Sequence, residues 1–286
     1  MMFYFQLTEY IILRLIRRFL FPYSLLLRVG RYIPYFRVNA NQDSALDIVN
    51  EYECLMREHA GKVLERQDLR ILEIGAGVTD TIGLLLSERF GCEVHVCDPY
   101  VRFDAEATRQ GVKRFNISSA AQDRTQRISQ PRAQSYDLIL SNSVLEHLED
   151  PEGFFRQMKG ALREGGVMIH RVDYRDHFFK YPYFFLMFSN WTWDIFLNPG
   201  DLFRWRLDDH IEAAITAGLT IELTGIETHQ TAYIALADRI SPRFRNKQFN
   251  EVLSAVLIFT ATLPTSSDKL CPSDRHSLSE VMLSDP

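Results

Sequence analysis

Short apolar runs alternate with helical patterns through the middle of the chain. The runs are rich in β-branched and aliphatic residues and end at glycine or polar residues, which is typical of buried strands. We predict strands at 69–77, 93–98, 136–142 and 167–173. Apolar residues spaced three and four apart, with Pro or Gly at the ends, predict helices at 79–91, 101–111 and 151–166. Strands that alternate with helices predict a parallel sheet covered on both faces.

The alternation is interrupted at 176–206, where 12 of 31 residues are aromatic. We interpret this segment as an insertion that forms a lid over the carboxyl ends of the strands. Its aromatic side chains could stack on a sugar, enclose an apolar acceptor, dip into a membrane, or pack as the core of a helical lid. Arg204 and Arg206 could hold a phosphate or carboxylate on the acceptor, or lie solvated at the surface.

The alternating pattern resumes after the insertion. We predict a helix near 207–218, a strand at 219–228, a helix through 235–250 and a last strand at 251–263. The tail 264–286 is polar and rich in Ser and Pro, and this composition predicts disorder.

Positive charge is concentrated at the start of the chain. Residues 1–37 carry six arginines and one acid, Glu9, a balance of +5, whereas the other 249 residues carry −10. An acidic body lacks the concentrated basic face that a nucleic-acid partner requires. The four cysteines show no CxxC spacing, so we expect neither a disulfide framework nor a zinc site, and a cytoplasmic location is favoured.

Residues 1–66 are predicted to form a helical extension. A first helix at 8–20 places arginines beside apolar residues, and a second helix follows with Asp43 or Ser44 as its N-cap. The sequence lacks the long apolar run of a transmembrane span and the pattern of a signal peptide. The first helix can lie at the inner face of a membrane, through residues 1–37, or cover the core or a homodimer interface; both interpretations stay open. Its arginines are Arg14, Arg17 and Arg18.

A glycine turn follows the first predicted strand and runs from Glu73 through Gly75 and Gly77 to Asp80. Glycines there let a ligand approach the backbone near the amino end of a helix. A dinucleotide fingerprint needs glycine at position 80, so Asp80 argues against a nicotinamide cofactor and favours a ligand with positive charge. The next strand ends at Asp98, where a carboxylate can accept both hydroxyls of a ribose.

The run ILEIGAG, Asp98 and the segment 135–170 closely resemble class I S-adenosylmethionine-dependent methyltransferases of the branch that acts on small molecules. The resemblance covers 67–172 clearly and continues more loosely to about 262. It implies a Rossmann-like α/β domain at 67–263, with a seven-stranded sheet, an antiparallel last strand, and S-adenosylmethionine across the carboxyl ends of the strands. The acid that contacts adenine in this family has no clear match, and Asp123 is the nearest candidate. By motif, the cofactor-binding residues would be Glu73, Gly75, Ala76, Gly77, Asp98, Asn142 and Ser143.

The segments around the insertion are similar to methyltransferases found with polysaccharide biosynthesis and glycosyl-transfer enzymes. We therefore expect O-methylation of a sugar or glycolipid-type acceptor. Two alternatives stay open: a methyltransferase of a membrane-borne lipid or quinone, and a non-catalytic protein that binds S-adenosylmethionine.

A hydroxyl acceptor gains from a nearby base, and histidine can accept a proton near neutral pH. His177, with Asp176 beside it, follows the fifth strand and is our first candidate for the base. His147 is the second candidate, with packing of the loop after the fourth strand as its alternative role. We predict no metal site, because the acids and histidines near 170–177 are irregularly spaced. These are His170, Asp173, Asp176 and His177.

Overall fold

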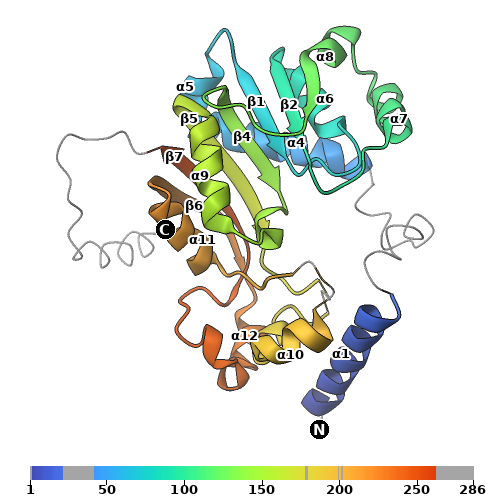
Figure 1. Ribbon diagram of the computed structural model, residues 1–286, viewed down its shortest axis with the longest axis vertical. Helices are drawn as coiled ribbons and strands as arrows, with labels where there is room; N and C mark the ends of the chain where they lie inside the picture. The colour runs from blue at the N-terminus through green and yellow to red at the C-terminus, as the bar shows by residue number, and fades with distance from the viewer. Residues whose placement is uncertain (1, 22–41, 178–179, 199, 201, 262–286) are drawn as a thin grey trace, which may run out of the picture.

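The computed structural model describes residues 2–21, 42–177, 180–198, 200 and 202–261 (Figure 1). Within them, seven strands form one sheet in the order β3-β2-β1-β4-β5-β7-β6. β7 is antiparallel to both of its neighbours, and the other pairs are parallel. The predicted sheet with an antiparallel last strand is therefore confirmed. The strands are β1 (Arg70–Ile74), β2 (Glu93–Cys97), β3 (Thr125–Ile128), β4 (Tyr136–Asn142), β5 (Leu162–Asp173), β6 (Leu219–Thr228) and β7 (Val252–Ala261).

Helices cover both faces of the sheet, because successive strand residues bury their side chains on opposite sides. In β1, Ile71 packs with α4 and α6, whereas Leu72 packs with α9 and α11. Figure 1 shows α9 and α11 in front of the sheet and α4 and α6 behind it. The helices around the sheet are α4 (Gln42–His59), α5 (Gly61–Leu64), α6 (Thr81–Phe90), α7 (Ala105–Phe115), α8 (Ser119–Arg124), η3 (Leu145–His147), α9 (Pro151–Ala161) and α11 (Leu207–Thr216).

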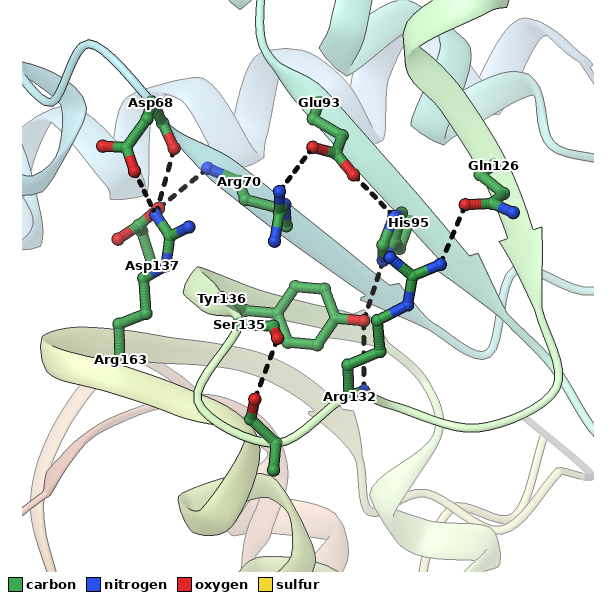
Figure 2. Close-up of polar contacts among 11 residues, drawn as sticks. Asp68, Arg70, Glu93, His95, Gln126, Arg132, Ser135, Tyr136, Asp137 and Arg163 are labelled. Carbon is green, nitrogen blue, oxygen red and sulfur yellow. Dashed lines mark hydrogen bonds and ion pairs between the residues drawn. The ribbon is translucent and has the colours of Figure 1, made fainter.

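The amino ends of the central strands are joined by a polar network (Figure 2). Asp137 is fully buried, and its carboxylate accepts hydrogen bonds from Arg66, from Arg163 at 3.0 Å and from the amide of Arg70 at 2.8 Å. A buried charge needs such compensation to be tolerated. The network stabilises the amino ends of these strands. A ligand is therefore expected at the opposite edge, where the strands have their carboxyl ends.

The insertion and the first helix form a separate small core beyond the carboxyl ends of the strands (Figure 1). α1 (Met2–Phe19) packs against the π-helix η5 (Trp193–Leu197), and none of the helices within the described residues has the length and hydropathy of a membrane span. Five of the ten described aromatic residues of the insertion are buried in this core, and two, Trp191 and Phe196, are exposed. The five buried residues are Tyr181, Tyr183, Phe184, Phe185 and Trp193. The other short elements of this core are η4 (Phe184–Met187), α10 (Asn190–Thr192), α12 (Gln230–Ile234), η6 (Ala237–Arg239) and η7 (Pro242–Phe244).

Three local predictions are wrong. The helix expected at 151–166 ends at Ala161, and β5 begins at Leu162. The single helix expected through 235–250 is broken into short turns, because Pro242 cannot continue a helix and disfavours helical backbone before it. The helix expected to start at Asp43 or Ser44 already includes both residues, since α4 begins at Gln42. The predicted tail 264–286 and part of the basic segment 1–37 lie outside the described residues.

Candidate functional site

The glycine loop leaves β1 at Ile74 and bends through two glycines with positive φ. Gly75 has φ +77° and Gly77 has φ +66°, a region that disfavours other residues. A Cβ on Gly75 would lie 2.2 Å from Cγ2 of Val144, so Gly75 lets the loop after β4 pack closely. A Cβ on Gly77 would meet no described atom within 4 Å, so this glycine faces open space. Ala76, between them, is half-buried against the core.

Asp98 follows β2 and holds the glycine loop in place. Its Oδ2 accepts a hydrogen bond from the amide of Gly77 at 2.8 Å, and its Oδ1 accepts from the amides of Tyr100 and Val101 at 3.0 Å each. A carboxylate has about four acceptor positions. One position on Oδ2 therefore remains for a ligand hydroxyl.

Asp80 is paired within the protein. Its Oδ1 lies 2.8 Å from Nε of Arg127, and Nη2 of Arg127 donates to the carbonyl oxygen of Gly77 at 3.1 Å. The expectation that Asp80 attracts a cationic ligand is therefore wrong, because Arg127 compensates its charge. Sequence reasoning missed Arg127, since only the register of β3 beside β2 brings it to the loop.

Glu73 lies beneath the glycine loop with a side chain that is only 3% exposed. Its Oε2 has no hydrogen-bond partner among the described residues. Burial, followed by the nearby charge of Asp80, raises the pKa of Glu73 to about 8. A positively charged ligand at the loop would favour the ionised form of this carboxyl group.

Asn142 ends β4 and Ser143 follows it, and both line a polar cavity of about 180 Å³. Arg171, Asp173 and Arg175 of the neighbouring chain segment also line it. Ser143 has φ +56°, an uncommon value for a residue with a side chain, and its amide donates to the carbonyl oxygen of Arg171 at 2.9 Å. This strained turn places the cavity at the carboxyl edge of the sheet.

Three side chains that can accept protons meet just beyond this turn. The rings of His147, in η3, and His177, after β5, have centroids 5.1 Å apart. One potential ligand atom from each histidine and one from Glu146 all lie within 4.8 Å of one another. Glu146 is 2% exposed, and neither carboxylate oxygen has a hydrogen-bond partner among the described residues. Burial raises the pKa of Glu146 well above its ordinary value.

The central part of the chain is similar to known methyltransferases. Residues 72–168, which span β1 to β5, match the family described as "Methyltransferase domain". The chain carries a class I methyltransferase domain. The match includes the glycine loop, Asp98 and the turn after β4.

The methyltransferase domain also resembles curated proteins named ubiquinone biosynthesis O-methyltransferase. The protein from Parvibaculum lavamentivorans is 31% identical over 112 residues, which cover 36% of this chain and 39% of that protein. The protein from Bradyrhizobium sp. is 24% identical over 201 residues, which cover 66% of this chain and 76% of that protein. The chain thus spans about two fifths of the first relative's length.

The fold of the methyltransferase domain is shared with a solved enzyme. This is phosphoethanolamine N-methyltransferase 2 from Haemonchus contortus, solved in complex with phosphomonomethylethanolamine and S-adenosylhomocysteine. The two structures align with a TM-score of 0.50 at 16% identity, over 75% of this chain and 53% of the other.

Asp176 pairs with the first helix of the chain. It is fully buried, forms an ion pair with Arg14 and accepts a hydrogen bond from Tyr10, both of α1. The guanidinium of Arg14 lies 4.9 Å from the ring centroid of Trp193. Asp176 thus joins the first helix to the insertion, one residue before His177. The expectation that Arg14 faces lipid headgroups is wrong, because its side chain is 1% exposed.

Arg204 and Arg206 are neither at the surface nor available to an acceptor. Arg204 is 1% exposed and donates to the carbonyl oxygens of Phe185 and Phe188 at 3.0 and 2.8 Å. Arg206 is fully buried and donates to backbone carbonyl oxygens, including that of Asn250 at 2.7 Å. Both interpretations of these arginines are therefore wrong, since they satisfy the backbone of the insertion core.

Two further candidates are displaced from the cofactor edge. Asp123 is exposed in α8, before β3 begins, so the strand direction places it at the amino edge of the sheet. His170 is fully buried in β5, where its Nδ1 lies 2.6 Å from Oγ of Ser141 and burial lowers its pKa to about 3. Neither residue can contact a ligand in this geometry.

Proposed function

We propose that this protein transfers a methyl group from S-adenosylmethionine to a hydroxyl oxygen of a quinone-type acceptor held at a membrane surface. The observation that carries the methyl-transfer part is the glycine loop, tied to Asp98 at the carboxyl edge of a methyltransferase fold. Relatives named for ubiquinone biosynthesis, together with the outer face of α1, support the choice of acceptor.

The residues of the loop fit S-adenosylmethionine. Gly77 faces open space where a ligand can approach the backbone, and Asp98 keeps one acceptor position for a ribose hydroxyl. A positively charged ligand would lower the pKa of buried Glu73 and so favour its ionised form. Asn142 and Ser143 would border the methionine part. When bound, the cofactor supplies an electrophilic methyl group on its sulfonium.

The chain's contribution to the reaction is positioning and removal of a proton. As the acceptor oxygen forms its bond to the methyl carbon, the carbon–sulfur bond breaks and its electron pair stays on sulfur. The hydroxyl proton leaves through the cluster formed by Glu146, His147 and His177. Asp176 acts as a positioning residue, because its pairing with Arg14 fixes the segment that carries His177.

Substitution of each histidine tests the role of this cluster. We expect His177→Ala and His147→Ala to lower turnover by about a hundredfold to ten-thousandfold. The affinity for S-adenosylmethionine should change little, because these residues lie on the acceptor side. Full turnover in both variants would show that transfer depends on positioning alone.

The acceptor is inferred from the outward face of α1. Its exposed side chains form an apolar stripe whose members are 38% to 75% exposed. This stripe lies opposite Tyr10 and Arg14, which are buried against the insertion. Next to α1, the exposed apolar side chains of Trp191, Ile195 and Phe196 extend from α10 and η5. The stripe consists of Met2, Phe5, Ile12, Ile16 and Phe19.

An apolar stripe on the solvent side of a helix is costly in water and is typical of an interfacial helix. Because the helix is tied to the segment before His177, a membrane that holds α1 would lie near the acceptor side of the site. A lipid-soluble acceptor could then enter without crossing water. The sugar or glycolipid acceptor expected from the sequence has no support among these relatives.

Vesicle binding tests this choice. The full chain should co-sediment with phosphatidylcholine and phosphatidylglycerol vesicles, and Ile12→Glu/Ile16→Glu should abolish binding. Ile215→Glu is the matched control, because Ile215 is 47% exposed on α11, away from α1. Loss of binding only in the α1 variant supports the proposal. Soluble wild-type protein that forms dimers through the same stripe would contradict it and assign the stripe to a subunit interface.

Methyl transfer then separates the acceptor classes. Labelled S-adenosylmethionine should label a polyprenyl catechol in vesicles, with little label in soluble hexoses or nucleotide sugars. Transfer to the sugars alone would contradict the quinone-type acceptor. Binding of S-adenosylmethionine without transfer to any hydroxyl would favour the non-catalytic alternative.

A further inference from the structure

The cluster of Glu146, His147 and His177 has the composition of a metal site. Two imidazoles and one carboxylate form the ligand set of many catalytic zinc centres and of other borderline divalent metals. Three protein ligands leave coordination positions open for water or substrate. The cluster stands at the acceptor side of the glycine loop, because Val144 contacts Gly75 immediately before η3 begins.

The burial of Glu146 is the independent observation that points to a cation. An ionised carboxylate without a partner is costly to bury, so a buried carboxyl group is either neutral or compensated by a hydrogen bond, an opposite charge or a metal. Both oxygens of Glu146 lack a hydrogen-bond partner within the described residues, although this side chain is 2% exposed. By contrast, the buried Asp137 is compensated by two arginines.

The spacing of the three side chains suits a metal after a small closure. Ligand atoms on a tetrahedral zinc lie about 3.4 Å apart, from bonds of about 2.1 Å. In the cluster, all the candidate atoms lie within 4.8 Å of one another. The widest pair would close by about 1.4 Å, which rotation of the two half-buried histidine side chains can provide.

We propose that Glu146, His147 and His177 bind one divalent transition-metal ion, with zinc as the reference ion, at the acceptor side of the cofactor site. The expectation of no metal site, drawn from residue spacing, is replaced by this proposal. The role of the ion in catalysis rests on the proposed function, whereas its binding does not. An acceptor hydroxyl that ligates the ion would lose its proton more readily and be oriented toward the methyl group.

Metal binding is measured directly on the metal-stripped, tag-free full chain that carries Cys54→Ser, because exposed Cys54 could bind zinc by itself. Titration with Zn²⁺ should give one site per chain. His147→Ala, His177→Ala and Glu146→Gln should each weaken it by more than about a hundredfold. His229→Ala is the control, because this exposed histidine caps α12 and should leave binding unchanged.

Glu146→Gln also separates loss of metal binding from loss of folded protein. Glutamine has nearly the same shape as the protonated side chain, so the metal-free variant should fold and be about as stable as the wild type. Zn²⁺ should raise the thermal midpoint of the wild type and not that of the variant. Cobalt substitution adds a spectroscopic test, because Co²⁺ on nitrogen and oxygen ligands gives visible absorption that the three variants should lose.

Stoichiometric binding that all three substitutions remove establishes the site. Absence of stoichiometric binding, or binding that survives these substitutions, overturns it. In that case methyl transfer by metal-free protein would still support the proposed function, with the imidazoles as the base. Failure of methyl transfer despite zinc binding would instead overturn the proposed function and leave the metal site intact.

Discussion

Asp98 connects the glycine loop to the ligand, and its substitution offers the sharpest test of the cofactor site. In Asp98→Ala, the amide of Gly77 loses a charge-assisted hydrogen bond of 2.8 Å, and a bound ribose loses its acceptor. A hydrogen bond to a charged group contributes about 1.5 to 3 kcal/mol of net free energy, after exchange with water is counted. Because one of these bonds is made to the ligand, we expect the affinity for S-adenosylmethionine to fall by about 1.5 to 3 kcal/mol, or roughly tenfold to 150-fold.

Isothermal titration calorimetry with S-adenosylmethionine and S-adenosylhomocysteine measures this loss. Asp104→Ala is the matched control, because Asp104 also accepts from two backbone amides, at 2.9 and 3.0 Å, but as the N-cap of α7. It should cost about 1 kcal/mol of stability and leave affinity unchanged. If folded Asp98→Ala protein binds both ligands as tightly as the wild type, Asp98 does not contact the ribose.

Three further substitutions test the surroundings of the site. Since the folded-state pKa of Glu73 is raised to about 8, its carboxyl favours folding at low pH and loses this contribution as pH rises through about 8. Glu73→Gln should therefore be more stable than wild type at pH 9, by up to about 4 kcal/mol in urea unfolding, and similar at pH 4. Arg14→Leu should cost about 3 to 5 kcal/mol, because it leaves Asp176 buried without its partner, and Arg14→Leu/Asp176→Leu should recover much of this. Gly75→Ala should cost about 1 to 3 kcal/mol and abolish cofactor binding, because its Cβ would meet Val144 at 2.2 Å; normal binding in calorimetry would contradict this.

The sheet and the glycine loop could be predicted because local signals and global packing agree there. The short apolar run before Gly75 is buried on both faces. A nearly continuous apolar run of this length is typical of a central strand in a parallel sheet. The position of Asp98 follows from the same logic, since β2 lies parallel to β1 and ends at the same edge.

The sequence could not predict the positions of residues whose contact partners are far away along the chain. Asp176 pairs with Arg14, 162 positions earlier, and this turns an expected catalytic acid into a structural ion pair. In the Glu146–His147 pair, the sequence pattern points to the histidine alone. The carboxylate of Glu146 could have been noticed as an acid between Leu145 and Leu148, two positions that pack inward.

The burial of Arg204 and Arg206 could not be predicted from the sequence either. Charged residues are usually exposed, so sequence reasoning placed both at the surface or on an acceptor. The insertion instead has irregular backbone whose carbonyl groups need donors, and the two guanidinium groups supply them. Which carbonyls lack partners is known only once the chain has folded.

Methyl transfer at the carboxyl edge of this sheet can be measured with a labelled cofactor. The full chain is incubated with S-adenosylmethionine labelled in its methyl group and with vesicles that contain a polyprenyl catechol. We expect labelled O-methyl product in amounts that exceed the enzyme, and loss of that product in Asp98→Ala and His177→Ala. Absence of labelled product from every hydroxyl acceptor, in a folded protein that binds the cofactor, would contradict this expectation.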